Sequence, residues 1–250
     1  MQAAASLVLV LLVLGVSRWQ KLELEKSIIW SVVRATVQLI AVGLLFTVIF
    51  ESEQAAVWAW LWVAAMVVAS AYVAARRAAG VPGVAVSAFT AIGANVTIVL
   101  LVVFGLGILD TEPVAIVVIA GITIGNTMPS TVQAALRMSD QLSEQRGEVE
   151  AMLSLGFDGA SATRRQSAQV TSHALVPQIE RTKVVGIIAL PGAMTGLLLA
   201  GTDPIDAVLI QLVVMILVLG SVAVAVTIVT LQIARKALTD DLRVADWVKR

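Results

Sequence analysis

Long apolar runs, separated by short polar stretches, dominate this chain. Six runs carry almost no charge, at 32–50, 55–75, 84–109, 114–128, 184–200 and 205–234, and a seventh covers 1–19. A helix needs about 20 apolar residues to cross the hydrocarbon core of a bilayer. The pattern therefore predicts an all-α integral membrane protein with seven transmembrane helices, provided that the fifth helix extends past Pro129.

The basic residues all belong to alternate connections between these runs. All 17 Lys and Arg residues are associated with the connections after the first, third, fifth and seventh spans, whereas the other connections carry only acidic charges. Basic loops stay in the cytoplasm during membrane insertion. We therefore expect an N-terminus outside, a cytoplasmic C-terminus, and a multi-pass protein of the plasma (inner) membrane.

The composition favours a single transmembrane domain over residues 1–250. Apolar residues make up 59% of the chain, charged residues make up 14%, and cysteine is absent. A soluble domain of this size could not bury so much apolar surface. Without cysteine, the chain has no disulfide framework and no thiolate metal site. The formal net charge of zero gives no indication of a nucleic-acid partner, so the lipid bilayer is the expected environment.

One connection is much longer than the others. Residues 129–183 are polar and are predicted to form a cytoplasmic coupling segment between spans five and six. The stretch 131–145 contains no helix breaker, so the fifth span is expected to continue as a helix beyond the bilayer.

Within this segment the sequence predicts two helices that meet at an elbow. A short helix over 148–155 is expected to end at Gly156, because glycine readily adopts the left-handed conformation that closes a helix. Asp158 or Ser161 can cap the next helix, which is expected to end before Pro177.

The sixth span is expected to be broken at Pro191-Gly192. Proline removes a backbone hydrogen bond there, and broken helices within membranes recur at transport sites. Gly192 and Gly196 are four residues apart, as are Gly121 and Gly125 on the fifth span, and such spacing allows close helix packing. The alternative is a plain kink with tight packing, and both interpretations can hold together.

Polar groups inside the spans are costly and are therefore candidates for a substrate pathway. The pathway candidates, including the break in span six, are Arg34, Gln38, Asn126, Pro191, Gly192, Met194, Thr195 and Gln211. Each has a local alternative. Arg34 can extend to the inner interface, the amides can bond between helices, and Met194 can fill a gap in the core.

The sequence assigns no metal ligands. His173 is the only histidine, and it lies in the coupling segment. Thioethers suit soft ions and not iron, so a harder ion would have to use oxygen atoms of amides, hydroxyls, backbone carbonyls at Pro191 or outer acids. No buried high-affinity iron site is evident. A weak, transient site and a different substrate both stay open.

The elbow carries a short motif. Glu150-Ala151, followed by Gly156, resembles the first half of the EAA signature of ABC-transporter permeases, in which this helix docks onto the ATPase subunit. The resemblance implies five candidate coupling residues: Glu150, Ala151, Leu155, Gly156 and Asp158. The alternative is a solvated hairpin.

A wider set of motifs resembles the FetB-type family of ABC-transporter permeases, which are iron exporters. These motifs are residues 30–39, Gly125-Asn126, 153–156, 183–186, 190–196 and 200–204, followed by Gln211. The resemblance implies a homodimer that pairs with a separate ATPase subunit, binds ATP-Mg only on that partner, and exports a metal ion such as iron. The same family includes plant half-transporters linked to aluminium tolerance, so the resemblance leaves the substrate open.

The chain itself carries no phosphate-binding loop. Such a loop needs a Lys that follows Gly, and no Lys of this chain does so. We therefore expect a transporter subunit and not an enzyme, with no cofactor of its own. A secondary transporter is the alternative, but it would need a carboxylate within the membrane, and no Asp or Glu lies in the middle of a span. An intramembrane enzyme fits less well, because the only histidine lies outside the spans and Ser70, Ser87 and Ser221 have no evident base. A scaffold would leave the broken span and the elbow unexplained.

Overall fold

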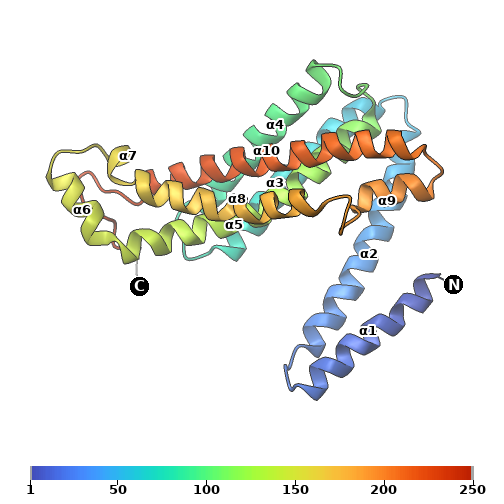
Figure 1. Ribbon diagram of the computed structural model, residues 1–250, viewed down its shortest axis with the longest axis horizontal. Helices are drawn as coiled ribbons and strands as arrows, with labels where there is room; N and C mark the ends of the chain where they lie inside the picture. Colours follow the sequence, from blue (N-terminus) through green and yellow to red (C-terminus); the bar gives the residue numbers. More distant parts are fainter. Residues whose placement is uncertain (1, 249–250) are drawn as a thin grey trace. The chain divides into compact units, whose positions relative to one another are not determined.

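Helices make up almost the whole of the chain in the computed structural model, which describes residues 2–248 and side chains from residue 8 onward (Figure 1). Within these residues there are ten helices and no strand. The prediction of an all-α protein is confirmed. The chain divides into two compact units, Met1–Ala55 and Ala56–Arg250. A single transmembrane domain over the whole chain stays a prediction.

The number of spans is confirmed only in part. Within residues 2–248, five helices are long and apolar enough to cross a membrane: α2 (Glu25–Phe50), α3 (Ala55–Arg77), α4 (Val84–Gly105), α5 (Pro113–Glu144) and α10 (Pro204–Lys236). The chain is therefore a multi-pass membrane protein. Seven spans, and the expected orientation of the two termini, stay predictions.

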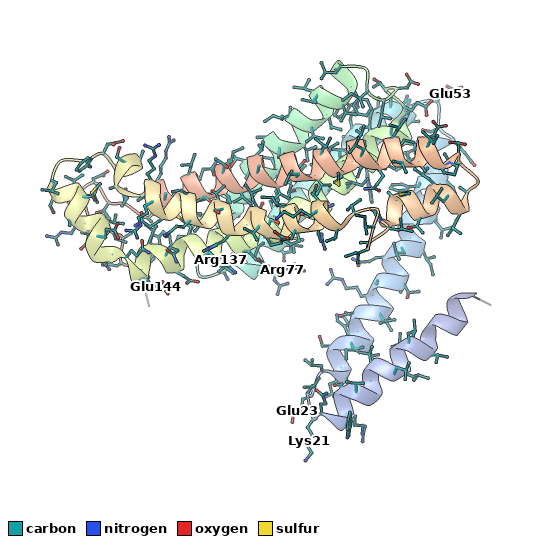
Figure 2. All side chains as sticks on the ribbon, viewed as in Figure 1. Lys21, Glu23, Glu53, Arg77, Arg137 and Glu144 are labelled. Atoms are coloured by element: carbon teal, nitrogen blue, oxygen red, sulfur yellow. The ribbon has the colours of Figure 1, made fainter. Side chains whose placement is uncertain are left out.

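The first unit contains a pair of helices. α1 (Gln2–Trp19) is joined to α2 by a short turn, where Figure 2 labels Lys21 and Glu23. The Ser17 hydroxyl donates to the Glu25 carboxylate across this turn, with an O···O distance of 2.9 Å. Most of α2 is exposed on all its sides. Such exposure of a mostly apolar helix is typical of a segment surrounded by lipid or by other helices.

The second unit is built around α10. This helix packs against α4, α5, α8 and α9. Its buried positions are mostly small or β-branched: Ala207, Gln211, Ser221, Val222, Ala225, Val226, Val229, Thr230, Ile233 and Ala234. Small side chains allow neighbouring helices to approach closely, which is the usual way that helices associate in a membrane.

α5 extends well beyond a membrane span. Its 32 residues correspond to about 48 Å, compared with a hydrocarbon core of about 30 Å. Its buried face runs from Ile116 to Leu142, so the helix stays packed along its length and continues through Pro129. Figure 2 shows Arg137 and Glu144 on the part that leads to α6. The expected continuation over 131–145 is present as far as Glu144.

Beyond α5 come α6 (Arg146–Ser154), α7 (Gly159–Ala162) and α8 (Arg164–Val184). The expectation that the last of these ends before Pro177 is wrong, because α8 continues through that residue. An internal proline costs about 3 kcal/mol. α8 packs against α10 and α5, and its buried residues, Gln166, Ser167 and Val170, all precede Pro177.

The sixth apolar run differs most from its prediction. It forms no single spanning helix, because residues 185–191 are not helical and α9 (Gly192–Leu199) has only eight residues. Eight residues reach about 12 Å, far less than a bilayer core. Gly186 adopts a φ of 84°, and the amides of Ile188 and Ala189 both donate to the Val184 carbonyl. These bonds end α8 early, so the break begins before Pro191-Gly192.

The predicted glycine pairs lie in different surroundings. A Cβ atom added at Gly121 would lie 3.5 Å from the Met66 Cε atom on α3, which is ordinary contact. At Gly125, Gly192 and Gly196, no heavy atom of the described chain lies within 4 Å of such a Cβ. Within one copy of the chain, only Gly121 lies against a neighbouring helix. Packing of the other three against a second copy stays a prediction.

Candidate transport pocket and coupling elbow

A cavity of about 450 Å³ lies between four elements of the second unit. α5, α8 and α10 form its walls, and the non-helical segment 185–191 with the start of α9 closes one side. Ligand sites in proteins usually have volumes of about 300 to 1,000 Å³. We call this cavity the central pocket.

The central pocket brings together four of the predicted pathway residues: Asn126, Pro191, Gly192 and Gln211. Gln211 is 7% exposed, and its side-chain oxygen has no hydrogen-bond partner within the described part of the chain. The Asn126 side-chain nitrogen donates to the Ile122 carbonyl at 2.8 Å. That bond fixes the amide against its own helix and leaves its oxygen as an acceptor.

The other four pathway candidates do not line this pocket. Met194 and Thr195 lie on α9, where the Thr195 hydroxyl donates to the Pro191 carbonyl at 2.7 Å. Arg34 and Gln38 lie on α2 in the first unit, and both are exposed. A role for these residues in a pathway stays a prediction.

Three polar residues of the pocket were not predicted from the sequence. Gln178, Arg181 and Thr182 all line the pocket from α8. Their i, i+3, i+4 spacing places them on one helix face, and that spacing could have identified them. These three residues were not predicted because the helix was expected to end before Pro177. The continuation of α8 to Val184 brings these side chains to the pocket.

Arg181 is the one charged residue among those that line the central pocket. It forms none of the ion pairs found in residues 2–248. Its neighbour Glu180 is already paired with Lys183, at an N···O distance of 2.8 Å. The guanidinium group is therefore available to an incoming ligand.

The pocket offers a metal ion only neutral oxygen atoms. No Asp or Glu lines it. Within the residues that the structure describes, no group of three or more His, Cys, Asp or Glu side chains could hold a metal ion. Sites of high affinity for hard ions usually include carboxylates.

A second cavity, of about 370 Å³, lies between α4 and α10. It is apolar apart from Asn95 and Ser221, which are 0% and 1% exposed. Neither side chain has a hydrogen-bond partner among residues 8–248. Unpaired buried amides are costly, so water is the simplest occupant that would satisfy them.

The elbow consists of α6, the turn at Gly156 and α7. α6 ends with two bonds, from the Phe157 amide to the Met152 carbonyl and from the Gly156 amide to the Leu153 carbonyl. With Gly156 at a φ of 87°, these bonds form a Schellman motif. The Asp158 carboxylate then accepts a bond from the Ser161 amide and caps α7. The elbow is thus a defined turn and not a loose loop.

Glu150 connects the elbow to the C-terminal tail, residues 237–248. Its carboxylate accepts a bond from Arg146 Nε at 3.0 Å and from the Val244 amide at 3.2 Å. Arg146 also donates to the Val244 carbonyl at 2.7 Å. The Arg146 bond, followed by the Val244 amide bond, lowers the pKa of the Glu150 carboxyl below its usual value. Val244 and Val248 are buried, so the tail packs firmly here.

Two further contacts connect the elbow to α8. Arg165 forms an ion pair with Glu148 at 2.9 Å. The buried Gln166 donates to the Gln145 side chain at 2.8 Å, between α5 and α6. The elbow is therefore attached to α5, α8 and the extension of α10.

The outer surface of the elbow is apolar. Leu155 is 76% exposed and Phe157 is 47% exposed, and Ala151 is exposed beside them. Among the predicted coupling residues, Glu150 is thus occupied with internal bonds, Asp158 caps a helix and Gly156 forms the turn. Only Ala151 and Leu155 present side chains outward, together with Phe157, which was not predicted.

Comparison with known proteins identifies a family. The profile of the "Uncharacterised protein family (UPF0014)" matches residues 1–238. UPF0014 membrane protein STAR2 of Oryza sativa subsp. japonica is 36% identical over 227 residues, which cover 90% of this chain and 79% of that protein. Protein ALUMINUM SENSITIVE 3 of Arabidopsis thaliana is 36% identical over 224 residues, covering 89% and 81%.

A bacterial relative is also similar over most of its length. The Probable iron export permease protein FetB of Escherichia coli is 31% identical over 227 residues, which cover 90% of this chain and 86% of that protein. No solved structure matches the chain.

Proposed function

Because this chain belongs to the UPF0014 family and is a multi-pass membrane protein, we propose that it is the membrane subunit of an ATP-driven exporter. In this proposal it acts as a homodimer with a separate ATPase of the ABC type, which binds ATP-Mg. The relative named as a probable iron export permease supports the choice of transport.

The exposed apolar surface of the elbow is the observation that carries the proposal. Leu155 and Phe157 are exposed in the turn that follows α6, a short helix whose charged side chains make internal contacts. Exposed apolar groups on a rigid support are typical of a protein-binding surface. An ATPase docked there would supply the phosphate-binding loop that this chain lacks.

Movement of the docked ATPase can reach the central pocket through packed helices. The elbow is bonded to α8 through Arg165 and to the C-terminal tail through Val244. α8 carries Arg181 to the pocket, and α10, which precedes the tail, carries Gln211. Closure of the ATPase dimer would therefore shift two pocket walls together, which is how packed elements transmit small displacements.

The proposed cargo is a metal ion, iron in the first instance, because of the FetB relative. Within the pocket, such an ion would find amide, hydroxyl and carbonyl oxygens, no carboxylate, and the positive charge of Arg181. Ligands of this kind bind weakly, which a transport pathway requires so that the ion can leave.

The test is ATP hydrolysis in proteoliposomes that contain this chain together with an ABC-type ATPase from the same organism. We expect the chain to stimulate hydrolysis and to move iron in an ATP-dependent way. Leu155→Asp should reduce both by at least tenfold, because a charge would be buried at the docking surface. Leu22→Asp is the matched control, since Leu22 is 46% exposed and lies in the turn between α1 and α2, away from the elbow in the chain.

Equal hydrolysis with wild type and Leu155→Asp would refute docking at the elbow. Transport that continues without any ATPase would instead identify a secondary transporter.

A further inference from the structure

The central pocket has the wrong charge for a bare metal cation. Arg181 is the one ionisable side chain that lines it, and it forms no ion pair in the described part of the chain. A fixed positive charge repels a cation and attracts an anion. Arg181 is exposed in a single copy of the chain, so solvent weakens this effect in part.

The pocket also presents hydrogen-bond donors beside this charge. A guanidinium group carries five N–H donors in a planar arrangement that matches carboxylate and phosphate oxygens. The side-chain amides of Gln178 and Gln211 add further donors. Gln211 is over nine-tenths buried. Its unpaired oxygen is an acceptor and does not bond to an anion, so only its side-chain nitrogen contributes a donor here.

The N-terminal end of α9 also favours an anion in the central pocket. Gly192 and Ala193 line the pocket, and the residue that precedes them, Pro191, makes no side-chain capping bond. The first N–H groups of a helix have no partner within the helix, and they bear partial positive charge. Such a helix start is a favourable position for an anion. The C-terminal end of α8 also borders the pocket through Val184. The carbonyl of this residue already accepts two backbone hydrogen bonds, from the amides of Ile188 and Ala189.

From these observations we propose that the central pocket binds a small organic anion with carboxylate or phosphate groups, and that Arg181 selects its charge. This proposal rests on the proposed function, because it assigns the substrate class of the same pocket. A metal exported by this route enters the pocket as a complex with such an anion and not as a bare cation.

The experiment uses the full chain in lipid nanodiscs and measures equilibrium binding by scintillation proximity. The probes are carbon-14 citrate, iron-55 ferric citrate, phosphorus-32 inorganic phosphate, and iron-55 ferrous ion without an organic anion. We expect wild type to bind at least one of the anionic probes and to bind the ferrous ion at least tenfold more weakly.

Arg181→Gln should weaken binding of the anion by about tenfold to a hundredfold, the usual effect of losing a charge-assisted bidentate bond. Arg181→Lys should recover part of this loss, because it keeps the charge without the planar pair of donors. Arg164→Gln is the matched control on the same helix. Arg164 is exposed, makes no ion pair in the described chain and lies outside the pocket. Thermal melts of each variant confirm that it is folded.

The probes separate the sources of the anion. Citrate binding without iron indicates a free organic anion as cargo, and binding of ferric citrate alone indicates an anionic metal complex. Phosphate binding indicates a phosphate compound. Ferrous ion bound alone and unaffected by Arg181→Gln would overturn the proposal, as would anion binding that Arg181→Gln leaves unchanged.

The proposed function is tested separately by ATP hydrolysis. If bare ferrous ion stimulates hydrolysis and no anion does, the anion pocket is refuted while the ATPase-driven exporter stands. If anions bind through Arg181 but no ATPase responds to the chain, the exporter is refuted and the binding site stands.

Discussion

The elbow and the central pocket use charged side chains in opposite ways. In the elbow, Arg146 pairs with Glu150 and Arg165 pairs with Glu148. In the pocket, Arg181 has no partner in the described chain, and the buried Gln211 oxygen has none either. Both regions are built on the same long helices, α5, α8 and α10, so the difference lies in the side chains and not in the fold.

The difference indicates what each region does. Paired groups fix neighbouring elements relative to one another, which suits a part that passes on movement. Unpaired polar groups cost stability, and they persist where a ligand pairs with them. The predictions that follow test this contrast, from the largest expected effect to the smallest.

Gly156→Val is expected to have the largest effect. The φ of 87° at this position is unfavourable for any residue with a Cβ, and most for a β-branched one, so the cost is about 1 to 3 kcal/mol. The turn of the elbow should loosen, and hydrogen exchange of residues 146–163 should rise. ATPase capture should fall with it. Gly147→Ala is the control, because Gly147 is helical and exposed, and has open space around it. Equal exchange in both variants would contradict a rigid elbow.

Gln211→Leu tests whether the buried amide in the central pocket serves ligand binding or helix packing. The substitution removes a buried polar oxygen without a partner and keeps a similar volume, so stability should stay equal or rise by about 1 to 3 kcal/mol. Ligand binding in the pocket should nevertheless decrease. Thermal unfolding in nanodiscs, together with the binding measurement, checks both parts. A clear loss of stability would show that Gln211 serves the packing of α10 and not a ligand.

The contact of Glu150 with the tail should depend on pH. Since folding lowers the pKa of this carboxyl, its contribution to stability is present above the ordinary pKa of glutamate, about 4.3, and is lost as pH falls through the lower folded value. Hydrogen exchange of residues 244–248, corrected for intrinsic rate, should rise in acid. Glu150→Gln should remove most of this pH dependence. Unchanged dependence in that variant would assign it to another group.

Arg165→Ala is expected to have the smallest effect. Its ion pair with Glu148 is largely exposed, with side-chain exposures of 64% and 45%. Exposed pairs contribute about 0 to 1 kcal/mol, so thermal unfolding should hardly change. A loss above this range would mean that the elbow depends on α8 more than its contacts indicate.

The sequence predicted the parts of this fold that depend on hydrophobic pattern and local turn chemistry. The five long helices follow from apolar runs, and the closure of α6 follows from Gly156. Asn126 and Gln211 were identified as costly polar groups within apolar helices, and the structure brings them to one pocket.

The errors arose where tertiary packing decided the outcome. Pro177 was expected to end a helix, but α8 continues past it to Val184. Because the helix was expected to end earlier, Arg181 was not predicted to line a pocket. The apolar run 184–200 was expected to break at Pro191-Gly192, but the break begins earlier, where the amides of Ile188 and Ala189 donate to the Val184 carbonyl. Glu150 matched a docking motif, and only the position of the C-terminal tail shows that its carboxylate is already bonded.

The most direct test of the account is a crosslink from the surface of the elbow. Because the chain has no cysteine, Leu155→Cys gives a single reactive site on the exposed apolar surface. In membranes that contain the ATPase, a thiol-to-amine crosslinker should join Leu155→Cys to that subunit, and Gly156→Val should abolish the product. Thr111→Cys, which is exposed in the connection between α4 and α5, should give none. ATP-driven transport by a Leu155→Cys complex that yields no crosslink to its ATPase would contradict docking at the elbow.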